Sequence, residues 1–496
     1  MLGRRSVVRE YLQGAVWVLP TLGIIVGLVA GALLAVVRIP PGSLADWFVF
    51  DGTPEDARQV LTVVSATMIT TTGIVFSLTV VSLQIASSQF SVRLLRTFLR
   101  DLSNQAVLAV FVCTFAYSTG GLYTVGEHPN GQLFVPGLAV SGSLALVFVS
   151  TGALVFFLHH LMHSIQIDTI MQKVQQLTLE LVDELFPDPD TPVATGVPHP
   201  APPTGAVVLL SRRSGYIQTI DVDALTGDAA ASGYAVQLVI CVGDYVTAGA
   251  MLGWYWDRGT HRRSAGAAGP DPQVPRRFWR HIQIGFERTL QQDIRFGLRQ
   301  LVDVALRALS PAINDPYTAI QIVHHLSAIE VVLAARAMPD DVRRDGTGEV
   351  LVWIPCPGFA VYLSVACSQI RRCAGQEPLV LGALLQMLSA VAASCVNAER
   401  RAAVQAQIDL VVSVSQRDLP EPSDRAMVAG AAAQARAVAE HPGTFAPPPS
   451  AFGNVAAAAA CEVTTGGGLI DTDGAYHNSA NARPIAGDPS TDDRLT

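Results

Sequence analysis

The sequence predicts an α-helical membrane protein with four transmembrane helices and a cytoplasmic α+β region. Of the 496 residues, 50% are hydrophobic and 15% are charged, whereas soluble domains carry about 25% charged residues. Four uncharged stretches lie in the first 160 residues, and each is long enough to cross about 30 Å of hydrocarbon. Downstream, short β-rich runs are followed by amphipathic helical patterns. We therefore expect a small β-barrel-like or sandwich-like module and a helical bundle after the membrane domain.

Residues 1–164 form the predicted transmembrane domain. Acidic side chains dominate the loop after the first apolar stretch, and arginines follow the second. By the positive-inside rule, the N-terminus, the loop after the second span and everything after the fourth lie in the cytoplasm. This predicts a multi-pass protein of the inner (plasma) membrane of the cell, with both termini cytoplasmic. The spans are expected at about 16–37, 61–86, 104–125 and 133–158, and the cytoplasmic basic cluster is Arg93, Arg96 and Arg100.

The first span contains three glycines, Gly23, Gly27 and Gly31, at intervals of four residues. Glycines at this spacing leave one face of a helix without side chains, so a neighbouring helix can approach closely. We interpret the three glycines as a helix-packing face.

The second span has a polar stripe. At 100° per residue its members fall within about 60° of one another on the helix. Such groups must face protein or water in a membrane, so they either bond to other helices or line a water-filled pathway. One stripe per chain cannot enclose a pore, so a pathway requires a homo-oligomer. The stripe consists of Thr70, Gly73, Ser77, Gln84, Ser88 and Ser91.

The cytoplasmic region is predicted in five parts. Hydrophobic residues at intervals of three and four favour a connecting amphipathic helix first, and proline then marks a linker. The β-rich part is punctuated by glycines, and the helical domain that follows precedes a tail expected to be disordered. The boundaries are 165–186 for the connecting helix, 187–205 for the linker, 206–257 for the β module, 273–440 for the helical domain and 441–496 for the tail.

The helical domain contains a polar group of residues that is a candidate ligand site or interface. Arg299 and Asp303 lie on the polar face of an amphipathic helix, and Asn314 and Asp315 lie in the turn after it. Asp315 followed by Pro316 is also a typical start of a helix, and this role alone explains the turn.

No motif in the chain indicates catalysis, and we expect neither enzymatic activity nor a cofactor. The sequence lacks P-loop, GxSxG and HExxH patterns. The seven cysteines have no CxxC spacing and predict no structural metal site. His159 and His163 share a helical face, but no carboxylate follows at a recognised metal-site spacing. A net charge of -8 argues against nucleic acid as a partner.

Two stretches of sequence resemble a known family. One runs from Thr72 to Leu95 and continues into Phe98–Asp101; the other runs from Arg288 to Asp303 and continues through Ser310-Pro311 to Asn314-Asp315-Pro316. Both are similar to the predicted bacterial membrane proteins called domain of unknown function 2254. The resemblance covers about residues 10–440 and implies a bacterial inner-membrane protein, with no activity or site residues to carry over.

Two hypotheses for function remain. The first is a homo-oligomeric, channel-like or permeation-related protein, in contact with the lipid bilayer and with copies of itself, whose cytoplasmic domain gates or assembles it. Its spans contain no Asp, Glu, Lys or Arg in their cores, which argues against a proton relay or a voltage sensor. The second is a non-transporting sensor or scaffold whose cytoplasmic domain binds a ligand or a protein.

Overall fold

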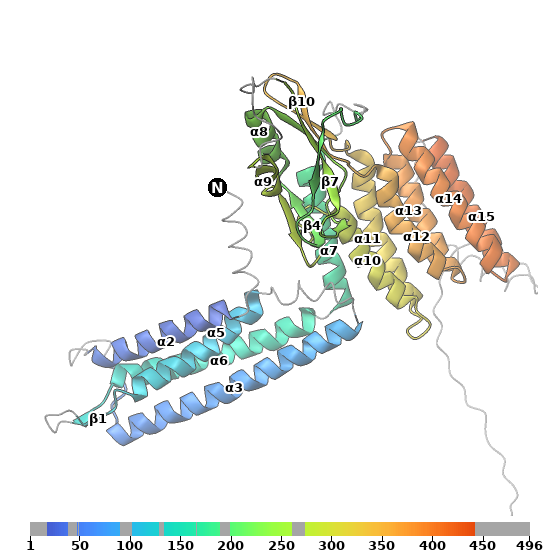
Figure 1. The fold of residues 1–496 in the computed structure, drawn as a ribbon. Coiled ribbons are helices and arrows are strands. Elements are labelled where there is room, and N and C mark those ends of the chain that lie inside the picture. The colour runs from blue at the N-terminus through green and yellow to red at the C-terminus, as the bar shows by residue number, and fades with distance from the viewer. Residues whose placement is uncertain are drawn as a thin grey trace, which may run out of the picture. The chain divides into compact units, whose positions relative to one another are not determined.

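The computed structural model describes residues 17–37, 47, 49–89, 102–127, 133–164, 166–188, 199–259 and 273–441 (Figure 1). The predicted tail at 441–496 falls outside this description apart from His441. Within these described ranges, five helices are long and apolar enough to cross a membrane. Four of them belong to the N-terminal part of the chain, and the fifth is α11 (Pro316–Ala335).

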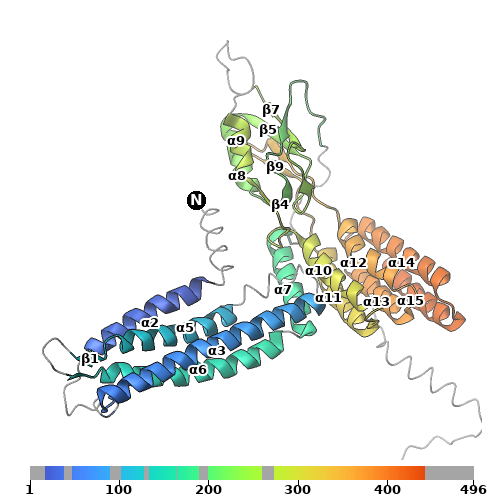
Figure 2. The ribbon, with the colours of Figure 1, turned by 60° about the horizontal axis from the view of Figure 1, so that its bottom comes forward.

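The N-terminal part is a unit of four long helices that lie side by side (Figure 2). Helix α5 packs against the other three, and a short hairpin of β1 (Gly126–Glu127) and β2 (Leu133–Phe134) precedes the last. The helices are α2 (Val18–Val36), α3 (Pro54–Gln89), α5 (Leu102–Leu122) and α6 (Gly137–Ser164).

Helix α3 begins several residues before the predicted start of the second span. Thr53 and Asp56 form a reciprocal cap, in which the backbone N–H of Thr53 donates to the Asp56 carboxylate (3.0 Å) and the backbone N–H of Asp56 donates to the Thr53 hydroxyl (3.2 Å). Pro54 suits the first helical position because it has no N–H to satisfy. The helix therefore starts at a polar capping signal, ahead of the apolar stretch from which the span was predicted.

The β region contains two sheets, and a closed barrel is not confirmed. A five-stranded sheet has the order β3-β7-β5-β10-β9, and a three-stranded sheet has the order β6-β4-β8. All neighbouring strands are antiparallel except β5 and β10, which are parallel. The strands are β3 (Val207–Leu210), β4 (Gly215–Ile220), β5 (Tyr234–Leu238), β6 (Tyr245–Val246), β7 (Met251–Asp257), β8 (Ile282–Gly285), β9 (Val342–Arg344) and β10 (Val350–Trp353).

The module predicted at 206–257 is therefore incomplete as an independent unit. Strands β8, β9 and β10 come from later in the chain. The module also contains a helix, α8 (Val222–Ser232), because Asp221 caps its start and Gly233, with φ 69°, ends it. A second short helix, α9 (Gln273–Trp279), precedes β8, and one apolar core joins both sheets and both helices.

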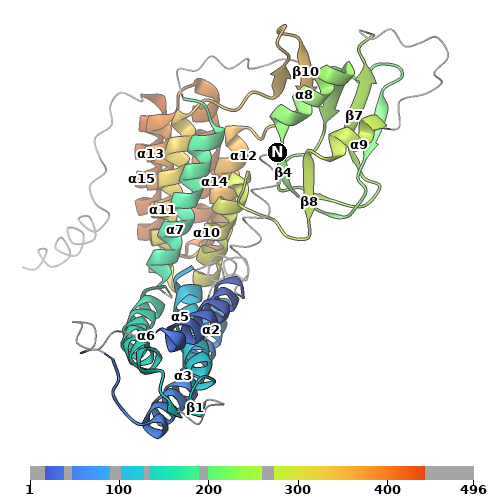
Figure 3. The same ribbon diagram turned by 90° about the vertical axis from the view of Figure 1, so that its left-hand side faces the viewer.

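Seven helices form a bundle with a single apolar core. Its first member is the predicted connecting helix, which packs against α10 and α11 (Figure 3). A Cβ on Gly297 of α10 would lie 2.2 Å from the Thr178 hydroxyl oxygen, so these two helices approach closely at a glycine. The members are α7 (Ile167–Leu185), α10 (Ile294–Ala308), α11, α12 (Phe359–Cys373), α13 (Pro378–Ser394), α14 (Ala398–Asp418) and α15 (Pro422–Glu440).

Candidate functional site

The polar stripe of α3 lies on the outer face of the four-helix unit. Thr70, Gly73, Ser77 and Gln84 are exposed, whereas Leu61, Val64, Met68, Val75 and Ser82 are buried. Each of Thr70, Ser77 and Gln84 follows a buried residue by two positions. Two residues turn a helix by about 200°, so the stripe points away from the other three helices.

The outward polar groups have few partners. The hydroxyls of Thr70 and Ser77 donate to backbone carbonyls four residues earlier, those of Ala66 and Gly73, each at 2.9 Å. The Gln84 amide has no hydrogen-bond partner among the residues that the structure describes. A Cβ on Gly73 would meet nothing within 4 Å. The outer face of α3 is therefore uncovered in one chain, and it mixes these polar groups with exposed apolar side chains such as Ile69, Phe76 and Val80.

Six other polar side chains inside the same unit form hydrogen-bonded pairs. Hydroxyl pairs join Ser65 to Thr119, Thr114 to Ser150 and Ser118 to Ser143, each at 2.9 Å. These contacts connect α3 to α5 and α5 to α6, as expected where water is absent. The hydrogen bonding that holds the unit together thus comes from residues outside the predicted stripe.

The predicted glycine face on α2 lies directly against α5. A Cβ on Gly23, Gly27 or Gly31 would lie 2.7, 2.3 or 2.3 Å from a backbone carbonyl oxygen of α5. No side chain fits at these positions without moving one of the two helices.

The structure does not describe the side chains of the other two predicted stripe residues or of the basic cluster. Ser88 belongs to α3, but its side chain lies outside the description. Ser91 and the basic cluster of Arg93, Arg96 and Arg100 also fall outside the described residues.

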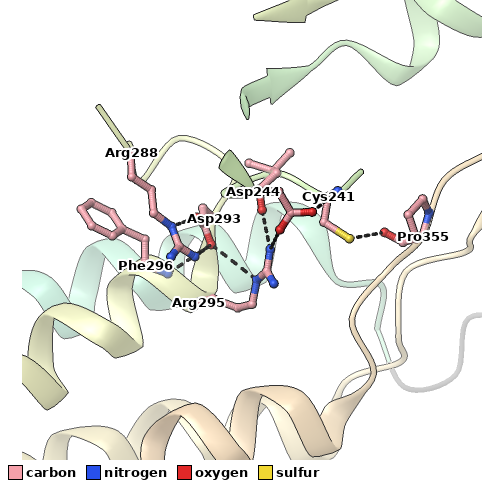
Figure 4. Close-up of polar contacts among 8 residues, drawn as sticks. Cys241, Asp244, Arg288, Asp293, Arg295, Phe296 and Pro355 are labelled. Carbon is pink, nitrogen blue, oxygen red and sulfur yellow. Dashed lines mark hydrogen bonds and ion pairs between the residues drawn. The ribbon is translucent and has the colours of Figure 1, made fainter. Parts of the chain in front are cut away.

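A second polar constellation joins the β region to the bundle (Figure 4). We call Asp244, Arg288, Asp293 and Arg295 the Asp293 cluster. The Asp293 side chain is 1% exposed and accepts two hydrogen bonds from the Arg288 guanidinium. The Asp293 carboxylate also accepts from the backbone N–H of Phe296 at 3.1 Å, and so caps α10. One buried carboxylate thus serves as helix cap and ion-pair partner.

Arg295 extends the Asp293 cluster to the loop after β5. Its guanidinium donates to the backbone carbonyl of Val242 at 2.7 Å and to Asp244 at 3.2 Å. Gly243 in this loop has φ 90°, and a Cβ there would lie 2.1 Å from the Asp293 carboxylate. The loop can lie directly on the ion pair because this residue is glycine.

A third segment, the loop after β10, is tied to the loop that carries Asp244 through Cys241. Its thiol donates to the backbone carbonyl of Pro355 at 3.0 Å, and Asp244 accepts from its backbone N–H at 2.8 Å. Burial, and then the charge of Asp244, raise the pKa of the Cys241 thiol. A thiol that stays protonated is a poor nucleophile, so the arrangement is suited to fastening segments together and not to thiol chemistry.

The four predicted ligand or interface residues of the helical domain have contacts within the fold. Arg299 pairs with Asp303 at 2.7 Å, one helical turn apart. Asn314 adopts the left-handed conformation, with φ 49°, in the turn between α10 and α11. Asp315 caps α11 by accepting from the hydroxyl and the backbone N–H of Thr318, and these hydrogen bonds lower the pKa of Asp315.

Metal-binding geometry is absent from the described part of the chain. No group of three His, Cys, Asp or Glu side chains there could hold an ion. The rings of His159 and His163 are tilted by 40° with centroids 4.3 Å apart, and a ring nitrogen of His163 lies 3.0 Å from the carbonyl oxygen of His159. These two histidines therefore contact each other and their own helix.

The Asp293 cluster was not predicted, although three of its four members lie in the second family-like stretch. A signal was present, since Asp293 stands just before an amphipathic pattern and is a favoured N-cap. The contact with Asp244, some fifty residues earlier, depends on the tertiary fold and leaves no local pattern.

Comparison with known proteins agrees with the membrane character of the chain. The family model for predicted membrane proteins DUF2254 matches residues 13–390. The uncharacterized proteins Rv1290c of Mycobacterium tuberculosis and Mb1321c of Mycobacterium bovis are each 66% identical over 464 residues, covering 94% of this chain and 88% of theirs. No solved structure matches the chain. The match over three quarters of the sequence, with these relatives, shows that the chain belongs to the DUF2254 family of predicted membrane proteins.

Proposed function

We propose that this protein is a homo-oligomer in the bacterial inner membrane whose copies meet at the outer face of α3 and enclose a permeation pathway there. Thr70, Ser77, Gln84 and Ser88 would line it, and the cytoplasmic domain would gate or assemble the oligomer. The observation that carries the proposal is the stripe of exposed polar side chains on α3, in a helix unit whose exposed surface is mostly apolar. Polar groups at membrane depth face protein or water. Neighbouring copies would supply the protein, and the pathway between them would supply the water.

The proposal includes four spans, α2, α3, α5 and α6, with α11 outside the membrane. The chain runs from strand β8 into α10, then through α11, and on to strand β9, which belongs to the same sheet as β5 and β7. Both ends of the α10–α11 pair are therefore joined to the β region. If α11 crossed the membrane, α10 would have to cross as well. Helix α10 has 15 residues, or about 22 Å of length, and it carries Arg295, Arg299, Asp303 and Arg307. A helix so short and so charged does not span about 30 Å of hydrocarbon.

The proposal is tested by potassium and chloride flux from liposomes that contain the purified full-length protein. Gln84→Leu places an apolar group in the proposed lining, and we expect flux to fall at least tenfold. The matched control is Thr151→Leu on α6, because Thr151 is also exposed and its hydroxyl also bonds to its own helix, at 2.9 Å. This control is expected to leave flux within twofold of the wild type.

Two results would contradict the permeation pathway. One is a closed oligomer that passes neither ion, and the other is flux that Gln84→Leu leaves unchanged. A monomer in detergent that also fails to cross-link in membranes would contradict self-association itself.

No contact among the described residues favours the alternative of a sensor or scaffold over the pathway. Asp303, Asn314 and Asp315 have structural roles in helix pairing, the turn and the cap. Their contacts account for their presence without a ligand.

A further inference from the structure

A buried carboxyl group lies in the core of the helical bundle without a partner. Glu330 of α11 is 0% exposed, and neither of its carboxyl oxygens has a hydrogen-bond partner among the residues that the structure describes. A buried polar group left unbonded is costly, and a buried unpaired charge is far more so. The packed bundle therefore favours the neutral, protonated form of this side chain.

Two functional groups of α12, the Cys367 thiol and the Arg371 guanidinium, are buried in the bundle. Cys367 is 0% exposed, and burial and then the charge of Glu330 raise the pKa of its thiol. Arg371, one turn later, is 7% exposed and its Nε has no partner, while an Nη donates to the backbone carbonyl of Leu410 at 3.5 Å. The core thus holds an unbonded carboxyl and an incompletely bonded guanidinium, with a thiol close to both on α12.

The other helices around α11 supply no partner for the carboxyl. Helix α13 has no titratable side chain between Pro378 and Ser394. On α10, Asp303 pairs with Arg299, and on α7, Asp183 pairs with Arg336. Within α11, His325 bonds to Gln175 of α7. Burial raises the pKa of the Glu330 carboxyl from 4.5 to about 8.

We propose that Glu330 is a proton-dependent switch in the bundle: the protonated carboxyl allows α11 and α12 to pack as observed, and its ionisation opens the contact between them. Ionisation creates a charge that the packed core does not solvate, whereas opening lets water or the Arg371 guanidinium reach it. The Arg371 guanidinium of α12 is a buried cation that the opened contact would offer to the carboxylate. This inference does not rest on the permeation pathway.

The direction of the pH dependence follows from proton binding. The packed bundle keeps the proton up to about pH 8, whereas an exposed glutamate releases it near pH 4.3. Between these values the unfolded chain binds fewer protons than the folded one, so the free energy of unfolding falls as pH rises. The open population is therefore expected to rise with pH up to about pH 8 and to level off above it.

The experiment is maleimide labelling of the full-length protein in detergent between pH 6 and pH 9.5, read for each cysteine by mass spectrometry. Cys373 is the internal reference, because it is exposed on the same helix; Cys395, which is buried elsewhere in the bundle core, reports global loosening. We expect labelling of Cys367 relative to Cys373 to rise at least tenfold across this range. The rate of each thiol is corrected with the denatured protein at the same pH.

The matched variant is Glu330→Gln, which keeps the shape of the side chain and removes its titration. It is expected to hold the ratio of Cys367 to Cys373 labelling within twofold from pH 6 to pH 9.5. If the amide variant does not fold, Glu330→Met serves the same purpose. A constant ratio in the wild type, an equal rise in the variant, or a parallel rise at Cys395 would each overturn the proposed switch.

Discussion

Replacing Asp293 by alanine removes the carboxylate at the centre of the Asp293 cluster. Loss of one partner of a buried ion pair costs about 3–5 kcal/mol, and loss of an N-cap costs about 1 kcal/mol. The side chains of Arg288 and Arg295 remain 26% and 21% exposed, so water stabilises them in part once Asp293 is gone. We therefore expect a loss of about 3 kcal/mol in the free energy of unfolding.

Thermal unfolding of the full-length protein, followed by tryptophan fluorescence, measures this loss. Trp254, Trp256 and Trp353 lie in the five-stranded sheet, close in the chain to the segments that meet at the cluster. A change of 1 kcal/mol moves Tm by about 2–4 °C in a domain of 150–250 residues, so Tm should fall by about 6–12 °C.

The matched control is Asp409→Ala, which removes an exposed ion pair with Arg436 in which the Asp409 side chain is 57% exposed. Such pairs contribute about 1 kcal/mol or less, so Tm should move by no more than about 4 °C. Asp293→Asn, which keeps a capping oxygen but loses the charge, should fall between the two. A Tm for Asp293→Ala within 2 °C of the control would refute the idea that this cluster fastens the β region to the bundle.

Three further predictions follow from the contacts. Gly27→Ala forces a Cβ to 2.3 Å from a carbonyl oxygen of α5 and should lower the stability by about 1–3 kcal/mol in a detergent-resistance assay. The control Gly152→Ala meets nothing within 4 Å and should leave the stability unchanged in that assay. Equal effects of the two variants would contradict the close packing of α2 on α5. Arg400 donates hydrogen bonds at 2.7–3.3 Å to the backbone carbonyls at the C-terminal end of α11. Arg400→Met removes this donor and should lower the free energy of unfolding by about 1–3 kcal/mol in urea unfolding. An unchanged free energy of unfolding would show that water replaces the guanidinium. The hydrogen bonds from Thr318 lower the pKa of Asp315, so the cap on α11 stabilises the fold above pH 3.8, the ordinary pKa of an aspartate, and is lost as pH falls below that value. The difference in stability between the wild type and Asp315→Ala should therefore vanish in acid. A difference that stays constant with pH would refute this role.

The four helices of the N-terminal part were predictable because each corresponds to a long, apolar and almost uncharged stretch of sequence. Periodicity also grouped Thr70, Ser77 and Gln84 on one face of α3. It could not show which side of the helix packs, because both sides are mostly apolar. The side that packs is set by the positions of α5 and α6. Against them lie the buried α3 residues Leu61, Met68 and Val75.

The β region was harder to predict for a physical reason. Strand β10 pairs with β5 across more than a hundred residues, and such pairing leaves no local signal. The module between 206 and 257 therefore looked self-contained although its sheets are completed by β8, β9 and β10. The Asp293 cluster was missed for the same reason, because Gly243 and Asp244 meet α10 only in the folded chain.

The central claim is that copies of this chain meet at the outer face of α3, and cross-linking in intact membranes tests it most directly. Ser77→Cys places a thiol in the middle of that face, and Phe148→Cys places one on α6, where the native side chain is 78% exposed. With a short bis-maleimide, and the unmodified chain as background, the account predicts covalent dimers from the cysteine at position 77 and none above background from position 148. No dimer from position 77, or equal yields from the two positions, would contradict self-association through α3.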